Sequence, residues 1–281
     1  MSGLSLPPLD IPALLRQFDL RPSKGLGQNF LKDNHSLQKI VHAAELRPDE
    51  AVLEIGPGLG SLTRYLSLAA RSVTAVELDR KLFPALESVL KPYKNVRLVQ
   101  GDILKLDPAE VMDVPGYVVV ANIPYYITSA VIRHLLEAGQ RPRRVVLTVQ
   151  KEVAERICAK PGDMSLLALS VQVYGQPAIS TIIPAEAFYP SPKVDSAVLC
   201  IEIHPQPVLP AEELGIFFQL TKAGFSQKRK TLRNSLAGGL RISPAECEAL
   251  LASAGIDPRR RAETLTLEEW GALVIFYRLK I

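Results

Sequence analysis

Cysteine is scarce in this chain, and its cysteines form no recognisable pattern. The 281 residues include only Cys158, Cys200 and Cys247, with no CxxC pair. A disulfide framework needs paired cysteines and a zinc finger needs closely spaced ones, so both are excluded and a reducing compartment is expected. The four histidines are equally scattered, and no metal site is expected.

Long apolar runs and a strong charge imbalance are also absent. No run of about 18 apolar residues occurs, so no membrane span is expected. Residues 1–18 lack a basic start and contain three prolines and Asp10, which argues against a signal or transit peptide and favours the cytoplasm. The net charge of +4 permits a polyanionic partner without requiring one.

The chain does contain short apolar runs that alternate with helix-like segments. Runs rich in Val, Ile and Leu are typical of parallel strands that are covered on both faces. Their alternation with helical periodicity predicts a doubly wound α/β domain. The expected strands are 51–55, 72–77, 95–99, 117–121, 144–149 and 197–203, and the expected helices include 62–69, 82–90 and 130–137.

The residue composition changes after the last of these strands. Residues 204–210 hold three prolines and predict a stiff linker. Capping boxes that begin at Ser243 and Thr266 predict helices beyond it, and no strand is evident there. The expected division is an N-terminal arm at 1–22, an α/β domain at 23–205 and a helical domain at 206–281.

A glycine-rich loop follows the first strand of the α/β domain. Glycine is needed where the backbone turns tightly and a ligand approaches the main chain. The spacing is GxGxG, with Gly56, Gly58 and Gly60, and Ser61 occupies the position where a dinucleotide loop has its third glycine. No GKS or GKT follows, so a P-loop is excluded as well.

Acidic residues lie at the ends of the next two strands. Glu77 is placed to accept hydrogen bonds from both hydroxyls of an adenosine ribose. Asp102 is placed to accept from the adenine amino group, with Ile103 against the ring. Either acid alone is as readily an ordinary surface residue at a strand end. Together with the glycine loop they predict a site for an adenosine compound without pyrophosphate, and S-adenosyl-L-methionine is the candidate cofactor.

The fourth strand ends in Asn122-Ile123-Pro124-Tyr125. An adenine N6 amine is a poor nucleophile because its lone pair is delocalised into the ring. The Asn122 side-chain oxygen and the Pro124 carbonyl supply two acceptors that would localise that lone pair. Tyr125 would stack on one face of the base and Phe188 would close the other, and a base in a duplex would have to be flipped out. The alternative is a plain proline turn at a strand end.

Several of these segments resemble one known family, the small-subunit ribosomal RNA adenine N6,N6-dimethyltransferases. The resemblance covers residues from about Lys24 to Tyr277 and rests on the motifs GQNFL, NIPYY, SPKVDS and FSQKRKTLRN. It implies a seven-stranded Rossmann-like S-adenosylmethionine-dependent methyltransferase sheet with a small C-terminal helical domain. The implied product is dimethyladenine at two adjacent adenines near the 3′ end of that RNA, and a role in ribosome biogenesis follows.

Site residues are carried over from the resemblance position by position. It implies a base slot formed by Asn122, Pro124, Tyr125 and Phe188. The cofactor contacts that it implies are Asn29, Leu31, Gly56, Glu77, Asp102 and Asn122. Gln28, Gly58 and Ile103, which lie in the same segments, are further candidate cofactor contacts. The implied partner is ribosomal RNA, free or in a pre-assembled small subunit, and a monomer is expected.

Basic residues form three groups that could contact RNA phosphates. Residues 211–281 hold 11 lysines and arginines against 8 acids, so most of the excess charge lies there. The resemblance favours Lys228, Arg229, Lys230 and Arg233 as the RNA contact. For the groups at 259–261 and 141–151, a solvated face is an equally good interpretation.

Three other functions remain as alternatives. One is adenine methylation of large-subunit RNA, which confers antibiotic resistance and shares the NIPY chemistry. Another is a non-catalytic RNA-binding assembly factor on the same fold, which an intact Asn122–Tyr125 segment disfavours. The last is an NAD-dependent oxidoreductase, which the glycine spacing disfavours.

Overall fold

The computed structural model describes residues 6–279, and these divide into two compact units. The first contains the chain up to Ala154 together with Pro177–Ile203, and the second contains Glu155–Gln176 and the chain from His204 onward. Within the described residues, no helix is both long and apolar enough to cross a bilayer.

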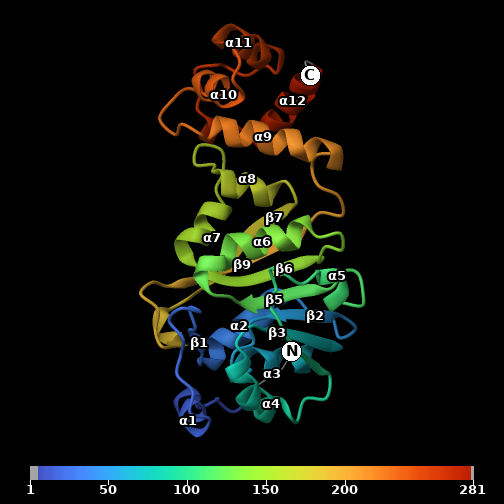
Figure 1. Ribbon diagram of the computed structural model, residues 1–281, viewed down its shortest axis with the longest axis vertical. Helices are drawn as coiled ribbons and strands as arrows, with labels where there is room; N and C mark the ends of the chain where they lie inside the picture. The colour runs from blue at the N-terminus through green and yellow to red at the C-terminus, as the bar shows by residue number, and fades with distance from the viewer. Residues whose placement is uncertain (1–5, 280–281) are drawn as a thin grey trace. The chain divides into compact units, whose positions relative to one another are not determined.

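A seven-stranded sheet forms the centre of the first unit (Figure 1). Its order is β4-β3-β2-β5-β6-β9-β7, with β2 to β6 parallel and β9 antiparallel to β6. The strands are β2 (Ala51–Ile55), β3 (Ser72–Glu77), β4 (Val96–Gln100), β5 (Val118–Asn122), β6 (Arg144–Gln150), β7 (Gly175–Ile183) and β9 (Ser196–Ile203). The predicted doubly wound α/β fold is therefore confirmed, and six of these strands were expected within one residue at each end.

Helices connect the parallel strands. In the right-handed crossovers that such sheets adopt, α3 and α4 lie on one face and α6 on the other. Helix α2 packs against α3 and also contacts β5, β6 and β9. The helices are α1 (Ile11–Gln17), α2 (Asn34–Ala44), α3 (Ser61–Ala69), α4 (Phe83–Leu90), α5 (Pro108–Val111), α6 (Thr128–Glu137) and α7 (Lys151–Ile157), with 3-10 turns η1 (Arg80–Leu82), η2 (Tyr125–Ile127) and η3 (Ala185–Ala187).

Two strand features were not expected from the sequence. Strand β7 follows a helix closely and lies at the edge of the sheet, and the residues between its buried ends alternate between half-buried and exposed. A separate two-stranded sheet joins β1 (Phe30–Leu31) to β8 (Phe188–Tyr189), with Leu31 opposite Phe188. Because these partners are far apart in sequence, local pattern carries no information about the pairing.

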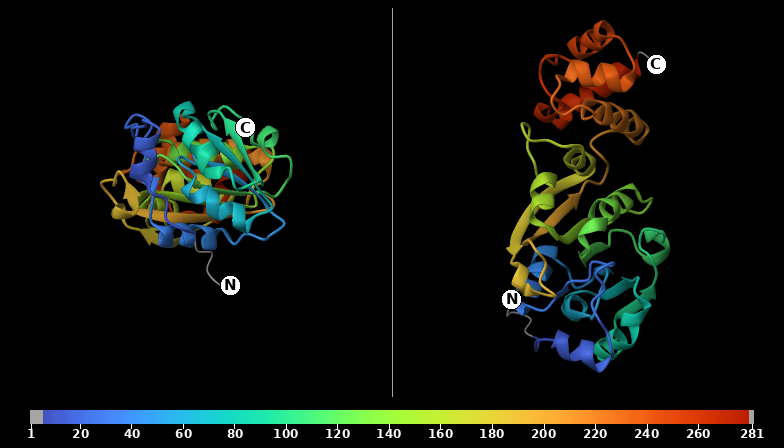
Figure 2. Two further views of the ribbon diagram at one scale, coloured as in Figure 1. Left: turned by 90° about the horizontal axis from the view of Figure 1, so that it is seen from below. Right: turned by 60° about the vertical axis from the view of Figure 1, so that its left-hand side comes forward.

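The described part of the N-terminal arm, residues 6–22, packs within the first unit. Ile11 and Leu15 of α1 are buried with Phe30, Leu59 and Leu82, which all line the cavity described below. Figure 1 and Figure 2 both place α1 beside α4. The arm therefore supports the outer wall of that cavity.

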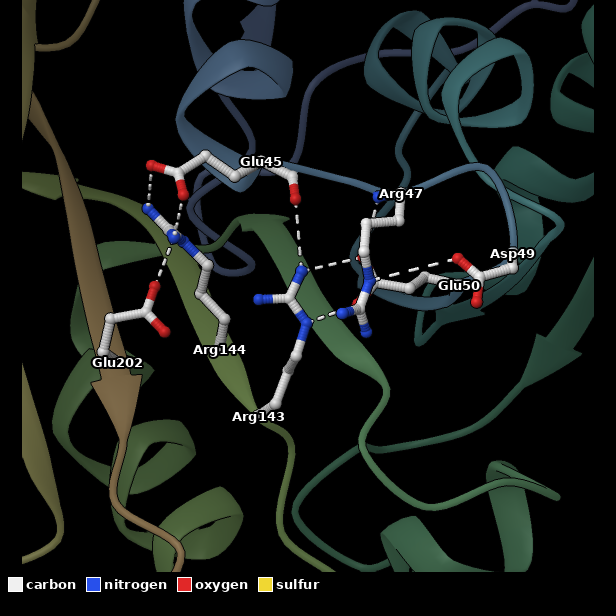
Figure 3. A network of polar contacts seen from close by, with 7 residues as sticks. All are labelled: Glu45, Arg47, Asp49, Glu50, Arg143, Arg144 and Glu202. Atoms are coloured by element: carbon white, nitrogen blue, oxygen red, sulfur yellow. Dashed lines mark hydrogen bonds and ion pairs between the residues drawn. The ribbon is translucent and has the colours of Figure 1, made fainter.

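A network of ion pairs closes the amino end of the sheet (Figure 3). Arg143 binds Glu50 through two nitrogens, and its Nη2 also donates to the Glu45 carbonyl at 3.2 Å. Arg144 is only 8% exposed and pairs with Glu45 and Glu202. These two arginines therefore do not form a solvated face, because both are paired with acids of the same unit.

The second unit is helical. Its members are α8 (Leu166–Gln172), α9 (Leu214–Gly224), α10 (Leu232–Leu240), α11 (Pro244–Ser253) and α12 (Leu267–Arg278), with 3-10 turns η4 (Ala211–Glu213) and η5 (Ala262–Thr264). Both predicted capping boxes are present, at Ser243 with Glu246 and at Thr266 with Glu269. The unit also includes Glu155–Gln176, which the sequence division had left in the α/β domain.

Candidate functional site

A cavity of about 1040 Å³, counted with the space at its mouth, opens at the carboxyl ends of β2, β3, β4 and β5. In open α/β sheets this end of the strands is where ligands bind. Every residue expected to contact the cofactor lines it: Gln28, Asn29, Leu31, Gly56, Gly58, Glu77, Asp102, Ile103 and Asn122. These residues come from segments separated by almost a hundred positions, so the fold brings the expected set together.

The glycine loop forms the floor of this cavity. Gly56, Gly58 and Gly60 have φ of +69°, +60° and +84°, a region that residues with a Cβ rarely adopt. A Cβ on Gly58 would also lie 3.0 Å from the Phe30 ring. Because glycine has no side chain, a ligand can approach the main chain of this loop closely.

Glu77 lies at the end of β3 and is 6% exposed. Burial raises the pKa of its carboxyl, and hydrogen bonds from the backbone N–H groups of Asp79 (2.8 Å) and Gly58 (3.1 Å) oppose that rise. The same turn is tied to the N-terminal segment, because Gln28 Nε2 donates to Asp79 Oδ2 at 2.8 Å. Glu77 is thus fixed relative to the glycine loop.

Asp102 and Ile103 follow β4 on the same side of the cavity. One Asp102 oxygen accepts from the Leu104 N–H at 3.1 Å, and the other lies 3.8 Å from Lys105 Nζ. Ile103 is 4% exposed and gives this wall an apolar surface. This wall therefore presents a carboxylate next to an apolar side chain.

The Asn122 amide is oriented by the N-terminal segment. Its Nδ2 donates to the Asn29 carbonyl at 3.0 Å, so its Oδ1 remains as an acceptor. The Pro124 carbonyl accepts from the Ile127 N–H at 3.2 Å, and its second lone pair is unused by that bond. Both acceptors expected from the sequence are therefore present in one loop.

The two tyrosines of this loop differ in their contacts. The Tyr125 hydroxyl is 2.8 Å from Ser196 Oγ, and burial raises the pKa of this tyrosine. Tyr126 is 63% exposed and also lines the cavity. The Tyr125 ring is thus held from β9, while Tyr126 is the more exposed ring at the cavity wall.

Phe188 is the one expected slot residue that does not line the cavity. Its side chain is 1% exposed and packs in the apolar core with Leu31 and Val198. Presenting its ring to a base would require β8 to shift.

Glu54 lines the cavity but was not singled out from the sequence. It is 1% exposed and is the next-to-last residue of the buried strand β2. An acid within an otherwise apolar strand that leads into a glycine loop is the signal that would have revealed it.

The basic groups of the second unit differ in how their charges are paired. Lys228, Arg229 and Lys230 are exposed in the loop between α9 and α10, and no acidic partner is found for them among residues 6–279. Arg233 is 3.5 Å from Glu248.

The neighbouring arginine cluster behaves differently. Arg259 pairs with Asp257, Arg260 with Glu269 and Arg261 with Glu263. For these arginines the solvated-face interpretation is favoured over RNA contact, because each already has an acidic partner within the unit.

The seven-stranded sheet and the GxGxG loop at the carboxyl end of its first parallel strand are typical of Rossmann-like methyltransferases. Solved structures of such enzymes are similar to the chain. The 23S rRNA methyltransferase ErmE is 32% identical with a TM-score of 0.71, covering 90% of this chain and all of the other. A dimethyladenosine transferase from Plasmodium falciparum is 26% identical with a TM-score of 0.77, covering 89% and 98%.

The sequence comparisons define the family more narrowly. The model of the family described as "Ribosomal RNA adenine dimethylase" matches residues 20–278. A Dehalococcoides mccartyi (strain CBDB1) protein named ribosomal RNA small subunit methyltransferase A is 51% identical, covering 94% of this chain and 91% of that protein. The protein of the same name from Moorella thermoacetica is 45% identical, covering 93% and 94%. The chain belongs to the ribosomal RNA adenine dimethylase family, is a methyltransferase, and uses S-adenosyl-L-methionine as its cofactor.

Proposed function

We propose that this protein dimethylates the N6 amines of two adjacent adenines near the 3′ end of small-subunit ribosomal RNA. The observation that carries the proposal is the Asn122 amide, which Asn29 orients so that its oxygen is an acceptor at the cavity wall. The relatives named small subunit methyltransferase A support the choice of RNA.

The cofactor pocket fits the group that the family requires. In this proposal Glu77 holds the ribose hydroxyls, Asp102 and Ile103 hold the adenine, and Gly56 and Gly58 allow close approach of the main chain. Gln28, Asn29 and Leu31 form the adjoining wall. When bound, S-adenosylmethionine supplies an electrophilic methyl group on a sulfonium.

The chain's own residues prepare the amine. In the first transfer Asn122 Oδ1 and the Pro124 carbonyl each accept one N6 hydrogen, which localises the nitrogen lone pair. In the second transfer the methylated amine has one hydrogen left, so only one of these acceptors is used. Tyr125 stacks on the base, and Ser196 holds its hydroxyl. Phe188 closes the second face only after β8 shifts. The step depends on alignment and electrostatics and needs no strong base.

RNA binding is assigned to the helical part of the chain. Lys228, Arg229 and Lys230 contact phosphates, with Arg233 beside them, while the α/β domain carries out the chemistry. We assign residues 1–22 to an N-terminal arm, 23–205 to the methyltransferase domain and 206–281 to the helical domain, although Glu155–Gln176 pack with the helical unit. The protein acts as a cytoplasmic monomer on RNA that is free or already assembled into a small subunit.

The test is methyl transfer from labelled S-adenosylmethionine to unmethylated small subunits and, in parallel, to unmethylated large subunits, followed by nucleoside mass spectrometry. Dimethyladenine at adjacent positions near the 3′ end is expected. Asn122→Ala should lower turnover by roughly 10²-fold or more, as the loss of one transition-state acceptor does. Asn34→Ala is the matched control, since Asn34 makes a similar 2.8 Å bond to a backbone carbonyl away from the cavity. Label only in large-subunit RNA would favour the ErmE-like activity and overturn the proposal.

A further inference from the structure

Glu54 is a buried acid that the proposed chemistry leaves without a role. It belongs to β2, directly before the glycine loop, and lines the cavity with 1% of its surface exposed. Its Oε2 atom is buried and accepts no hydrogen bond within residues 6–279. No ion pair involving Glu54 is found in that part of the chain either.

The surroundings of Glu54 disfavour its charged form. The pKa of its carboxyl is raised to about 8, because burial and the nearby Glu77 raise it more than Thr63 on α3 lowers it. The strands beside it contribute Ala75 and Val120 at its register positions, and neither can carry charge. At neutral pH the carboxyl is therefore mostly protonated in the empty cavity.

An isolated buried carboxylate is costly, but the cost falls when a cation lies beside it. S-adenosylmethionine carries two cationic groups, a sulfonium and an α-ammonium. We propose that Glu54 is the counter-charge of the bound cofactor and that the cavity exchanges the Glu54 proton for the cofactor's positive charge. This inference rests on the proposed cofactor site.

The proton balance follows directly. Glu54 loses its proton to the buffer as the cationic cofactor binds, so the cavity keeps nearly the same total charge. The carboxyl regains a proton when the cofactor product leaves. Proton release that wild type shows and a Glu54→Gln variant lacks therefore reports this exchange.

The experiment is titration calorimetry of the full chain with S-adenosylmethionine in buffers of different ionisation enthalpy. A group of pKa about 8 is about 0.9 protonated at pH 7 and about 0.1 at pH 9. Wild type should therefore release about 0.9 proton more than Glu54→Gln at pH 7, and only about 0.1 more at pH 9. Comparing the two proteins cancels titration of the cofactor's own amine, whose pKa is about 8.

The same titration with S-adenosylhomocysteine identifies the cation that Glu54 pairs with. That product keeps the ammonium and lacks the sulfonium. Undiminished proton release would show that Glu54 pairs with the ammonium, and loss of proton release would show that it pairs with the sulfonium. Glu87→Gln, at an exposed position of α4 outside the cavity, is the matched control and should behave as wild type.

Two results would overturn the proposal in different ways. Cofactor binding by wild type without excess proton release at pH 7 would refute the role of Glu54 and leave the proposed function intact. Failure of wild type to bind the cofactor would refute both. If Glu54→Gln does not fold, the decision rests on wild type alone, where release at pH 7 has to reach roughly 0.8 to support the exchange, after the cofactor amine is allowed for.

Discussion

Two adjacent glycines of α10 should respond in opposite directions to the same substitution. A Cβ on Gly239 would lie 2.5 Å from Ala223 Cβ and 2.7 Å from its Cα, so the helices α9 and α10 would have to separate. Overpacking of this kind costs roughly 1–3 kcal/mol. A Cβ on Gly238 would meet only the end of the Gln227 side chain, at 3.4 Å. Gly238→Ala should instead stabilise the helix by about 0.5–1 kcal/mol.

Urea unfolding followed by tryptophan fluorescence is a suitable assay. The only tryptophan, Trp270, is fully buried in the second unit, so its signal reports that unit. The gain in helix propensity applies to both variants, so their free energies of unfolding should differ by the overpacking cost of roughly 1–3 kcal/mol. The basic loop between α9 and α10 connects the same helices, so Gly239→Ala should also weaken RNA binding. Equal stabilities of the two variants would refute the steric reasoning.

Three further predictions concern the site and its support. Tyr125→Phe should lower the free energy of unfolding by about 1–3 kcal/mol, because it leaves the fully buried Ser196 hydroxyl without its partner. In calorimetry, the double variant with Ser196→Ala should recover part of this loss. Purely additive effects of the two substitutions would contradict the pairing. Changing Lys228, Arg229 and Lys230 to Gln should reduce the slope of log affinity for RNA against log salt concentration by about 2. Arg259→Gln removes a charge that is paired with Asp257 and should change this slope little. Equal effects of the two changes would refute the assignment of the RNA contact. Burial opposes ionisation of Glu50, yet bonds from Arg143 and the Arg47 N–H outweigh it and keep its pKa below the usual range. The ion pair therefore stabilises the fold above the unfolded-state pKa, and this stability is lost as the pH falls through the folded-state pKa; Glu50→Gln should be less stable than wild type at pH 7, with the gap closing in acid, and a gap independent of pH would contradict this.

Much of the fold was evident from local pattern. Continuous apolar runs predict strands such as 51–55 because a strand covered on both faces has no polar side. The capping boxes at Ser243 and Thr266 predict helix starts because the bonds are made within four residues. The GxGxG loop predicts a bare backbone because positive φ is accessible mainly to glycine.

Patterns with long-range partners were less informative. Strand β7 begins within a short polar stretch and contains a proline, so its place at the sheet edge depends on β9. The association of Glu155–Gln176 with the second unit has no signature in composition. The arginines at 143 and 144 look like a surface patch until Glu45, Glu50 and Glu202 are brought beside them.

The sequence by itself determined the residue types of the site and their order along the strands. Only the tertiary structure decided how each group is oriented and charged. The Asn122 amide is oriented by Asn29, 93 residues away, and the Phe188 ring is buried by its pairing with Leu31. Glu54 has a raised pKa because the fold removes it from water and provides no cation. Burial and distant partners set these properties, and neither is encoded by neighbouring residues.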